Sequence, residues 1–168
     1  MIRLGIAFVV LAAVIAGVTA RYFVWPSLAS PSAADAVIVL GGPGDRYNTG
    51  ARLVRQGLAP VMVASSDRSS GGCPGTMDDV PIICFTPDPY STRGEARYVA
   101  DLARERGWNH VIIVTSVGQA SRAQLRLERC FDGDIDVVAV RPVGLRVVRD
   151  AIYEWGANFK ALVLERDC

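Results

Sequence analysis

Three loops of this chain carry residues that could bind an anion. The first, residues 41–46, reads GGPGDR and directly follows an apolar run. Its glycines allow backbone N–H groups to turn toward an anion, and the helix expected after it would add partial positive charge. The loop matches neither GxGxxG nor a P-loop, and a tight strand-to-helix turn capped by Asp45 would explain it equally well. The candidate ligand-binding residues here are Gly41, Gly42, Asp45 and Arg46.

The second loop, residues 91–95, reads STRGE. Thr92 and Glu95 have the spacing of a capping box, in which both side chains bind backbone N–H groups at the start of a helix. Capping alone would therefore explain these two residues. It does not explain Arg93, so all three residues are candidates for binding a ligand.

The third loop, residues 114–123, reads VTSVGQASRA. Ser116 and Gln119 also fit a capping box. Arg122 would lie one turn into the following helix, where its side chain would face the cleft or solvent. An exposed arginine contributes little to folding, whereas an arginine in a cleft can hold an anion. Ser116, Gln119 and Arg122 complete the set of candidate ligand-binding residues.

Several other kinds of chemistry find no support in the sequence. The single histidine, His110, precedes an expected strand and is interpreted as a solvated turn residue at the wrong end of the sheet for a Ser/His/Asp triad. The carboxylates are too scattered to predict a metal site, and the sequence leaves the cofactor unknown. The formal net charge is +1 and no Lys/Arg cluster is present, so nucleic-acid binding is not expected. Whether the protein is an enzyme stays open.

The elements that must position these loops alternate between strands and helices. Apolar runs predict five buried strands, and helical periodicity fills the segments between them. This pattern predicts an α/β fold, a Rossmann-like three-layer α/β/α sandwich with a five-stranded parallel sheet of order 3-2-1-4-5. Ligands bind beyond the carboxyl ends of such strands at the switch point, so the three loops should converge there. The expected strands are residues 36–40, 60–64, 81–85, 111–115 and 135–140.

The N-terminal segment is long and apolar. Residues 4–20 carry no charge and would form a helix of about 25 Å, which is short for a membrane span unless Arg21 snorkels. The aromatic residues that follow suit a membrane interface, and a single-pass anchor with its N-terminus inside is expected. A signal peptide cleaved after Ala20, giving a secreted protein, and a buried core helix are alternatives. The expected organisation is an anchor or signal over 1–25, a linker over 26–34 and one domain over 35–168 outside the cytoplasm.

The four cysteines also favour an oxidising compartment. None has the close CxxC spacing of a zinc or redox site, and an even number of scattered cysteines in an exported chain suggests structural disulfides. Four unrelated buried thiols are the alternative. We expect Cys73 to pair with Cys84, which would close a short loop, and Cys130 to pair with Cys168.

The order and spacing of these motifs resemble a known family. The segments ADAVIVLGG, QGLAP, STRGEA, VIIVTS and SRA, which lie between about Asp35 and Glu154, resemble the YdcF-like family. This is domain of unknown function 218, and it includes SanA- and ElyC-type envelope proteins. The resemblance implies a Rossmann-like fold and a role in envelope integrity and in cell-wall or surface-polymer biogenesis. By position it adds Thr115 and Glu154 to the shared cleft.

One departure from the family bears on catalysis. The family commonly has a histidine after VTS, and here that place holds Gln119, which hydrogen-bonds but does not exchange protons near neutral pH. Three hypotheses follow: a cleft that binds a phosphorylated or anionic envelope precursor, a non-catalytic module beside cell-wall biosynthesis proteins, or a binder of a nucleotide-like cofactor. The expected partners are therefore the membrane, such a precursor and cell-wall biosynthesis proteins.

Overall fold

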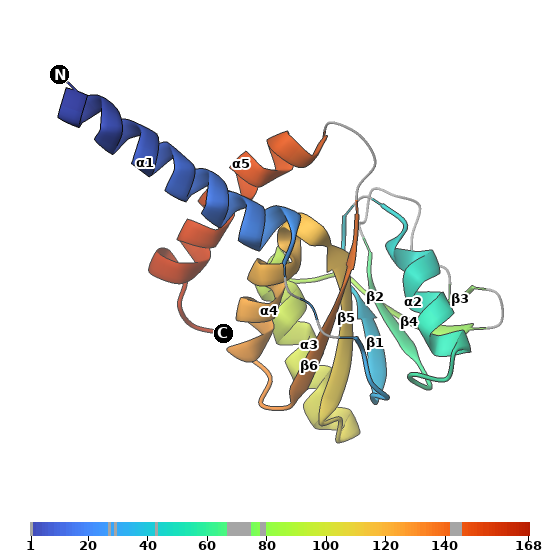
Figure 1. Ribbon diagram of the computed structural model, residues 1–168. Helices are drawn as coiled ribbons and strands as arrows, with labels where there is room; N and C mark the ends of the chain where they lie inside the picture. The colour runs from blue at the N-terminus through green and yellow to red at the C-terminus, as the bar shows by residue number, and fades with distance from the viewer. Residues whose placement is uncertain are drawn as a thin grey trace.

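The domain is built on one twisted sheet whose strands run mainly parallel (Figure 1). A computed structural model describes residues 2–26, 28, 30–42, 44–66, 75–77, 80–141 and 146–168; for residue 2 and residues 146–152 only the backbone is described. The sheet has six strands in the order β3-β4-β2-β1-β5-β6. The strands are β1 (Ala36–Val39), β2 (Met62–Ser65), β3 (Thr76–Met77), β4 (Val80–Phe85), β5 (His110–Ser116) and β6 (Asp134–Val140).

The five expected strands occupy the expected relative order, but the sheet is not purely parallel. The two-residue strand β3 pairs antiparallel with β4 at the edge, where the sequence carries no alternating or continuous apolar run. The other neighbours pair in parallel. Strands β1 and β5 are adjacent at the centre, so their carboxyl ends lie side by side at the switch point.

Helices cover both faces of the sheet, because the central strands are apolar on both sides. Helix α2 (Arg46–Arg55) packs on one face through Ala51 and Leu53, against Val37 and Val39 of β1. Helices α3 (Thr92–Arg106) and α4 (Ala120–Glu128) cover the other face. The short 3-10 helix η2 (Val117–Gln119) joins β5 to α4.

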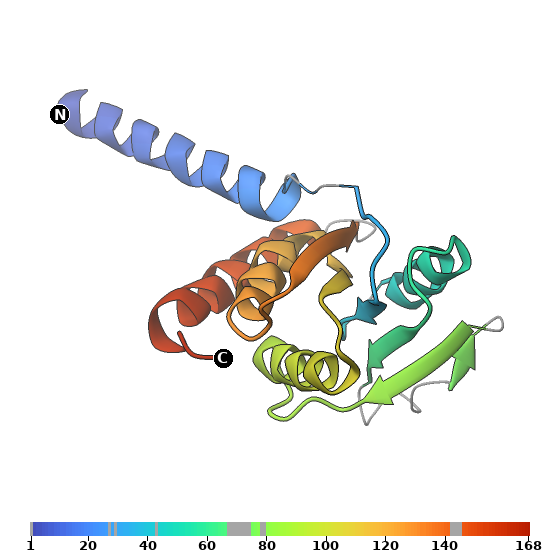
Figure 2. The same cartoon turned by 90° about the horizontal axis from the view of Figure 1, so that it is seen from below.

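The N-terminal helix projects away from the domain (Figure 2). Helix α1 (Ile2–Thr19) continues into a π-helical turn, η1 (Ala20–Val24). Residues Arg3–Val24 form a helix with an 18-residue stretch of mean hydropathy 2.2 that is unburied within the molecule, so the helix is long and apolar enough to span a membrane or to be a signal sequence. The last turn contacts the domain, because Phe23 is buried and the Tyr22 carbonyl accepts a hydrogen bond from Ser121 Oγ at 3.0 Å.

The C-terminal segment returns past η2 and is fixed to the end of α4. Helix α5 (Arg146–Phe159) continues into a π-helical turn, η3 (Lys160–Leu164). The predicted disulfide between Cys130 and Cys168 is present, with an S–S distance of 2.12 Å. Cys84 is also disulfide-bonded; its predicted partner, Cys73, lies outside the described residues. The alternative of four free thiols is therefore wrong.

Candidate functional site

A polar cavity of about 240 Å³ lies at the carboxyl ends of β1 and β5. It is where the loops after these strands meet the start of α3, as the switch-point rule predicts. Six of the ten candidate residues line it: Gly41, Gly42, Thr92, Glu95, Gln119 and Arg122. The other lining residues are Pro87, Tyr90, Ser91 and Tyr153.

Glu95 does not cap α3, although its spacing from Thr92 predicts a capping box. The N-cap of α3 is Ser91, whose side chain accepts a hydrogen bond from the Gly94 N–H at 3.3 Å. Glu95 instead accepts a hydrogen bond from the Gly41 N–H at 2.6 Å, 54 residues away in sequence. Burial raises the pKa of Glu95, although this N–H and the nearby guanidinium groups act to lower it. The capping explanation of Glu95 is therefore wrong, and the carboxyl group belongs to the cavity.

The two glycines after β1 are needed for this close approach. A Cβ at Gly41 would lie 3.2 Å from Glu95 Oε1 and 3.3 Å from Ser65 Oγ. Gly42 has a φ of +125°, and a Cβ there would lie 2.9 Å from the Arg46 guanidinium. The loop therefore brings backbone against buried charged groups, which a simple capped turn would not require.

Arg46 lies beneath the cavity rather than in its lining. Its Nη1 donates to the carbonyl of Leu40 at 3.1 Å and to the carbonyl of Gly41, and its Nη2 donates to Gln119 Oε1 at 3.0 Å. Burial lowers the pKa of Arg46, but an arginine stays charged at neutral pH. Its Nε is buried and has no hydrogen-bond partner within the described part of the chain. Arg46 therefore holds the floor of the site together and adds a fixed positive charge to it.

Gln119 is oriented by two donors, not by a capping box. Its Oε1 accepts hydrogen bonds from Arg46 Nη2 and from Thr115 Oγ1, the latter at 3.2 Å. Because an arginine can only donate, the amide oxygen must face Arg46, and the NH₂ group of this lining residue is left as a donor. Ser116 is the N-cap of η2 but makes no side-chain capping bond, so the predicted box with Gln119 does not form.

Arg122 lines the cavity, one of the two expected positions, and it is also held in a buried ion pair that the sequence did not predict. Its Nε and Nη2 donate to the two carboxylate oxygens of Glu154 at 2.8 and 2.9 Å, a bidentate arrangement. Its Nη1 donates to Thr92 Oγ1 at 2.6 Å, so Thr92 also has a role other than capping. Pairing with Glu154 outweighs burial, and the pKa of Arg122 is raised. Glu154 thus lies beside the cleft, as the family resemblance implies.

Three other candidate residues, like Arg46, lie outside the lining, and so does His110. Arg93 points outward, where it binds the backbone oxygen of Cys168 and the carboxylate of Asp167. Asp45 is exposed at the N-cap of α2 and accepts a hydrogen bond from Asn48, without capping through its side chain. Ser116 is not in the lining. His110 is part of β5 and half-buried against Asp136 at 3.1 Å, so it is not a solvated turn residue.

Sequence reasoning missed four lining residues, three from the segment directly before α3 and one from α5: Pro87, Tyr90, Ser91 and Tyr153. Tyr153 reaches the cavity because α5 crosses back over the carboxyl edge of the sheet, and no local spacing marks that return. Ser91 is the nearest miss, since it precedes a helical pattern as an N-cap should. Among the described residues no group of three or more His, Cys, Asp or Glu could hold a metal ion.

Comparison with family models, with curated proteins and with solved structures gives no match to this chain. The resemblance to the YdcF-like family therefore stays a prediction. The functional proposal therefore rests on the geometry of the cavity.

Proposed function

We propose that this protein is a membrane-anchored, YdcF-like envelope protein whose cavity binds the anionic, phosphoryl-type group of a cell-wall or surface-polymer precursor. One observation supports this most strongly. Four charged side chains from four different helices converge around one cavity, with exposed fractions of 1% for Arg46, 6% for Glu95, 9% for Arg122 and 2% for Glu154. Buried ion pairs are weak sources of stability, whereas perturbed charges under a cavity are typical of functional sites.

The charge balance of this cluster favours an anion. Two arginines contribute +2, and Glu154, paired with Arg122, contributes −1. Burial raises the pKa of Glu95 and so favours its neutral form, in which the cluster carries +2 − 1 = +1. The N–H groups left on Arg122 and the amide of Gln119 supply donors for oxyanion oxygens.

Binding is a better proposal than acid–base catalysis by Gln119, because an amide does not exchange protons near neutral pH. Any proton transfer at this site would fall to Glu95. A nucleotide-like cofactor is a weaker proposal, since the cavity of about 240 Å³ is below the usual range of about 300–1,000 Å³ for drug-sized ligands. Partners among the cell-wall biosynthesis proteins remain part of the proposal.

Calorimetric titration of the full chain in detergent micelles tests the proposed ligand class. We expect a sugar 1-phosphate to bind at least about ten-fold more tightly than the same sugar without phosphate. Arg122→Lys should weaken binding although it keeps the charge, because lysine cannot form the bidentate pair. The matched control is Arg104→Ala, which removes an exposed arginine paired only with Asp101 and should leave affinity unchanged. Equal affinities for the two sugars, or binding of neither, would contradict the proposal.

We also propose that α1 is retained as the anchor and that the domain lies outside the cytoplasm. The alternative cleavage point, after Ala20, falls within a helical turn whose neighbour Phe23 is buried against the domain, whereas a peptidase needs an accessible segment. The disulfides support an oxidising compartment. A reporter that is active only in an oxidising compartment, fused after Cys168, should be active. An inactive reporter there, with a cytoplasmic reporter active at the same point, would refute this topology.

A further inference from the structure

Helix α5 and its continuation η3 expose a row of large apolar side chains. Trp155 and Phe159 lie one helical turn apart, and Leu162 and Val163 follow at the next turn. Their exposed fractions are 41%, 60%, 52% and 45%. We refer to these four residues as the α5 stripe. Large apolar side chains grouped in this way on a surface mark a contact with a partner or a membrane.

Hydrogen bonds and a disulfide fix the segment that carries the α5 stripe to the rest of the domain. Arg126 of α4 donates to the carbonyl and the carboxylate of Glu165, both at 2.6 Å. Arg129 donates to the carbonyl of Ala161 at 2.7 Å, and the Cys130–Cys168 disulfide closes the segment onto α4. These contacts fix the inner side of η3 to the domain, so its apolar side chains are kept facing outward.

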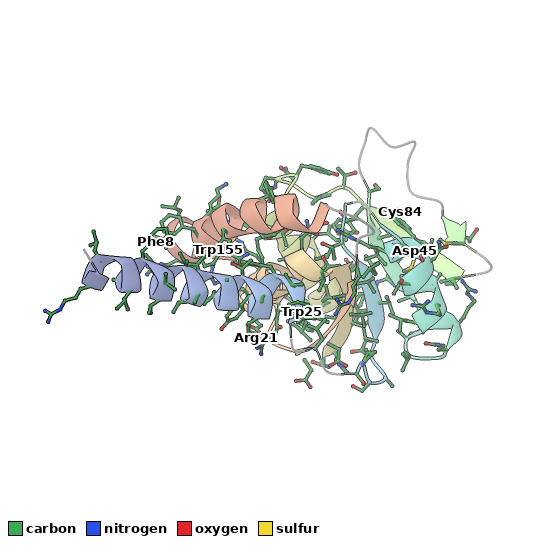
Figure 3. The ribbon with its side chains drawn as sticks, turned by 45° about the horizontal axis from the view of Figure 1, so that its top comes forward. Phe8, Arg21, Trp25, Asp45, Cys84 and Trp155 are labelled. Atoms are coloured by element: carbon green, nitrogen blue, oxygen red, sulfur yellow. A yellow bond between two sulfur atoms is a disulfide. The ribbon has the colours of Figure 1, made fainter. Side chains whose placement is uncertain are left out.

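The α5 stripe begins at the point where α1 meets the domain. Trp155 Nε1 donates to Thr19 Oγ1 at 3.0 Å, and the rings of Trp155 and Phe23 form an edge-to-face contact with centroids 5.7 Å apart. Figure 3 shows α1 and α5 on the same side of the domain, with Trp155 on α5 near α1. In Figures 1 and 2, α5 passes the C-terminal end of α1 and runs across its direction.

We propose that the α5 stripe is a second membrane contact, which lies in the interface of the leaflet from which α1 emerges. This rests on the proposed anchoring of α1. If α1 spans the bilayer, a helix that crosses it at residues 19–23 lies near the membrane plane, at the depth where tryptophan is favoured. An interfacial helix buries its apolar face about 5–10 Å into the headgroup boundary.

The chemistry of the neighbouring residues favours lipid over a second copy of the chain. Lys160 lies beside the stripe with an exposed side chain that pairs with Glu165 at 2.9 Å, and a lysine there can keep its ammonium group at the level of the headgroups. Tyr153 of the same helix borders the polar cavity. The contact would therefore hold the mouth of the cavity next to the lipid headgroups.

Quenching of single tryptophans by lipids brominated near the top of the acyl chain tests the proposal. The chain has three tryptophans, Trp25, Trp108 and Trp155, and replacing two at a time by phenylalanine gives three reporters of the full chain in phosphatidylcholine vesicles. A fourth reporter, Phe159→Trp with all three native tryptophans replaced, places the probe one turn further from α1. We expect Trp25, Trp155 and the position 159 reporter to lose at least about half of their fluorescence, as interfacial side chains should. Trp108, at the opposite end of β5, should be unaffected.

The reporters separate failure of this proposal from failure of the anchor. Quenching of Trp25 without quenching at position 159 overturns the second contact, whether or not Trp155 is quenched, because Trp155 also touches α1. Shielding of position 159 from acrylamide without quenching by brominated lipid overturns it in favour of a second protein copy. Absence of quenching at Trp25 overturns the proposed anchor itself, and the second contact with it.

Discussion

Arg122→Ala should lower the free energy of unfolding by about 3–5 kcal/mol at neutral pH, the cost expected when one partner of a buried ion pair is removed. The reason is that Glu154, 2% exposed, would lose both hydrogen bonds that its carboxylate receives from Arg122. Urea unfolding of the full chain in detergent, followed by circular dichroism, measures the change. An arginine that faced solvent, one of the two positions expected from the sequence, would contribute little.

Two further variants show whether the pair is responsible. Replacing both partners by apolar residues, Arg122→Met with Glu154→Leu, should recover most of the loss because no unpaired charge remains. Arg104→Ala, at an exposed pair, should change the free energy of unfolding by less than about 1 kcal/mol. If Arg122→Ala costs no more than Arg104→Ala, the buried pair is not formed.

Glu95→Gln should stabilise the protein at neutral pH. Because burial raises the pKa of Glu95 in the folded state, the folded protein binds this proton more strongly than the unfolded chain does. The stability that goes with the protonated carboxyl is fully present below the ordinary value of 4.5 and is lost as the pH rises through the higher folded-state pKa. Glutamine keeps an oxygen acceptor for the Gly41 N–H without the charge, so the variant avoids this loss.

The pH profile of unfolding distinguishes this effect from a general change in packing. The difference between Glu95→Gln and the native chain should be small near pH 4 and should grow as the pH rises. A difference that is independent of pH, or a variant that is less stable at neutral pH, would show that the Glu95 carboxylate is well stabilised in the fold. A functional role would explain why the site contains a residue that reduces stability.

The fold could be predicted from the sequence because its elements are locally encoded. Continuous apolar runs such as 111–115 identify central strands, and Gly107, in a left-handed conformation, ends α3 as a glycine at this position commonly does. Strand β3 was missed because two residues carry no periodicity. The switch-point rule placed the cavity at the right edge, since it depends only on strand order.

The details of the site could not be predicted, because local spacing does not determine tertiary partners. Thr92 and Glu95 fit a capping box, yet shifting the cap by one residue to Ser91 leaves both free for the cavity. Arg93 and Arg122 both lie near the start of a helix, but they lie on helix faces with different neighbours. Arg93 therefore binds the C-terminal segment, whereas Arg122 binds Glu154. That partner lies 32 residues along the chain from Arg122.

The pH dependence of anion binding tests the central claim most directly. Inorganic sulfate is a suitable probe, since its charge does not change over the range in which Glu95 titrates. Calorimetry on the full chain should show affinity falling as the pH rises and Glu95 ionises. Glu95→Gln should bind sulfate without this pH dependence, and at a pH above the raised pKa of Glu95 it should bind sulfate at least about ten-fold more tightly than the native chain, because a nearby negative charge is then removed. If Glu95→Gln abolishes binding, or if sulfate binds neither protein at any pH, the cavity is not the anion site that we propose.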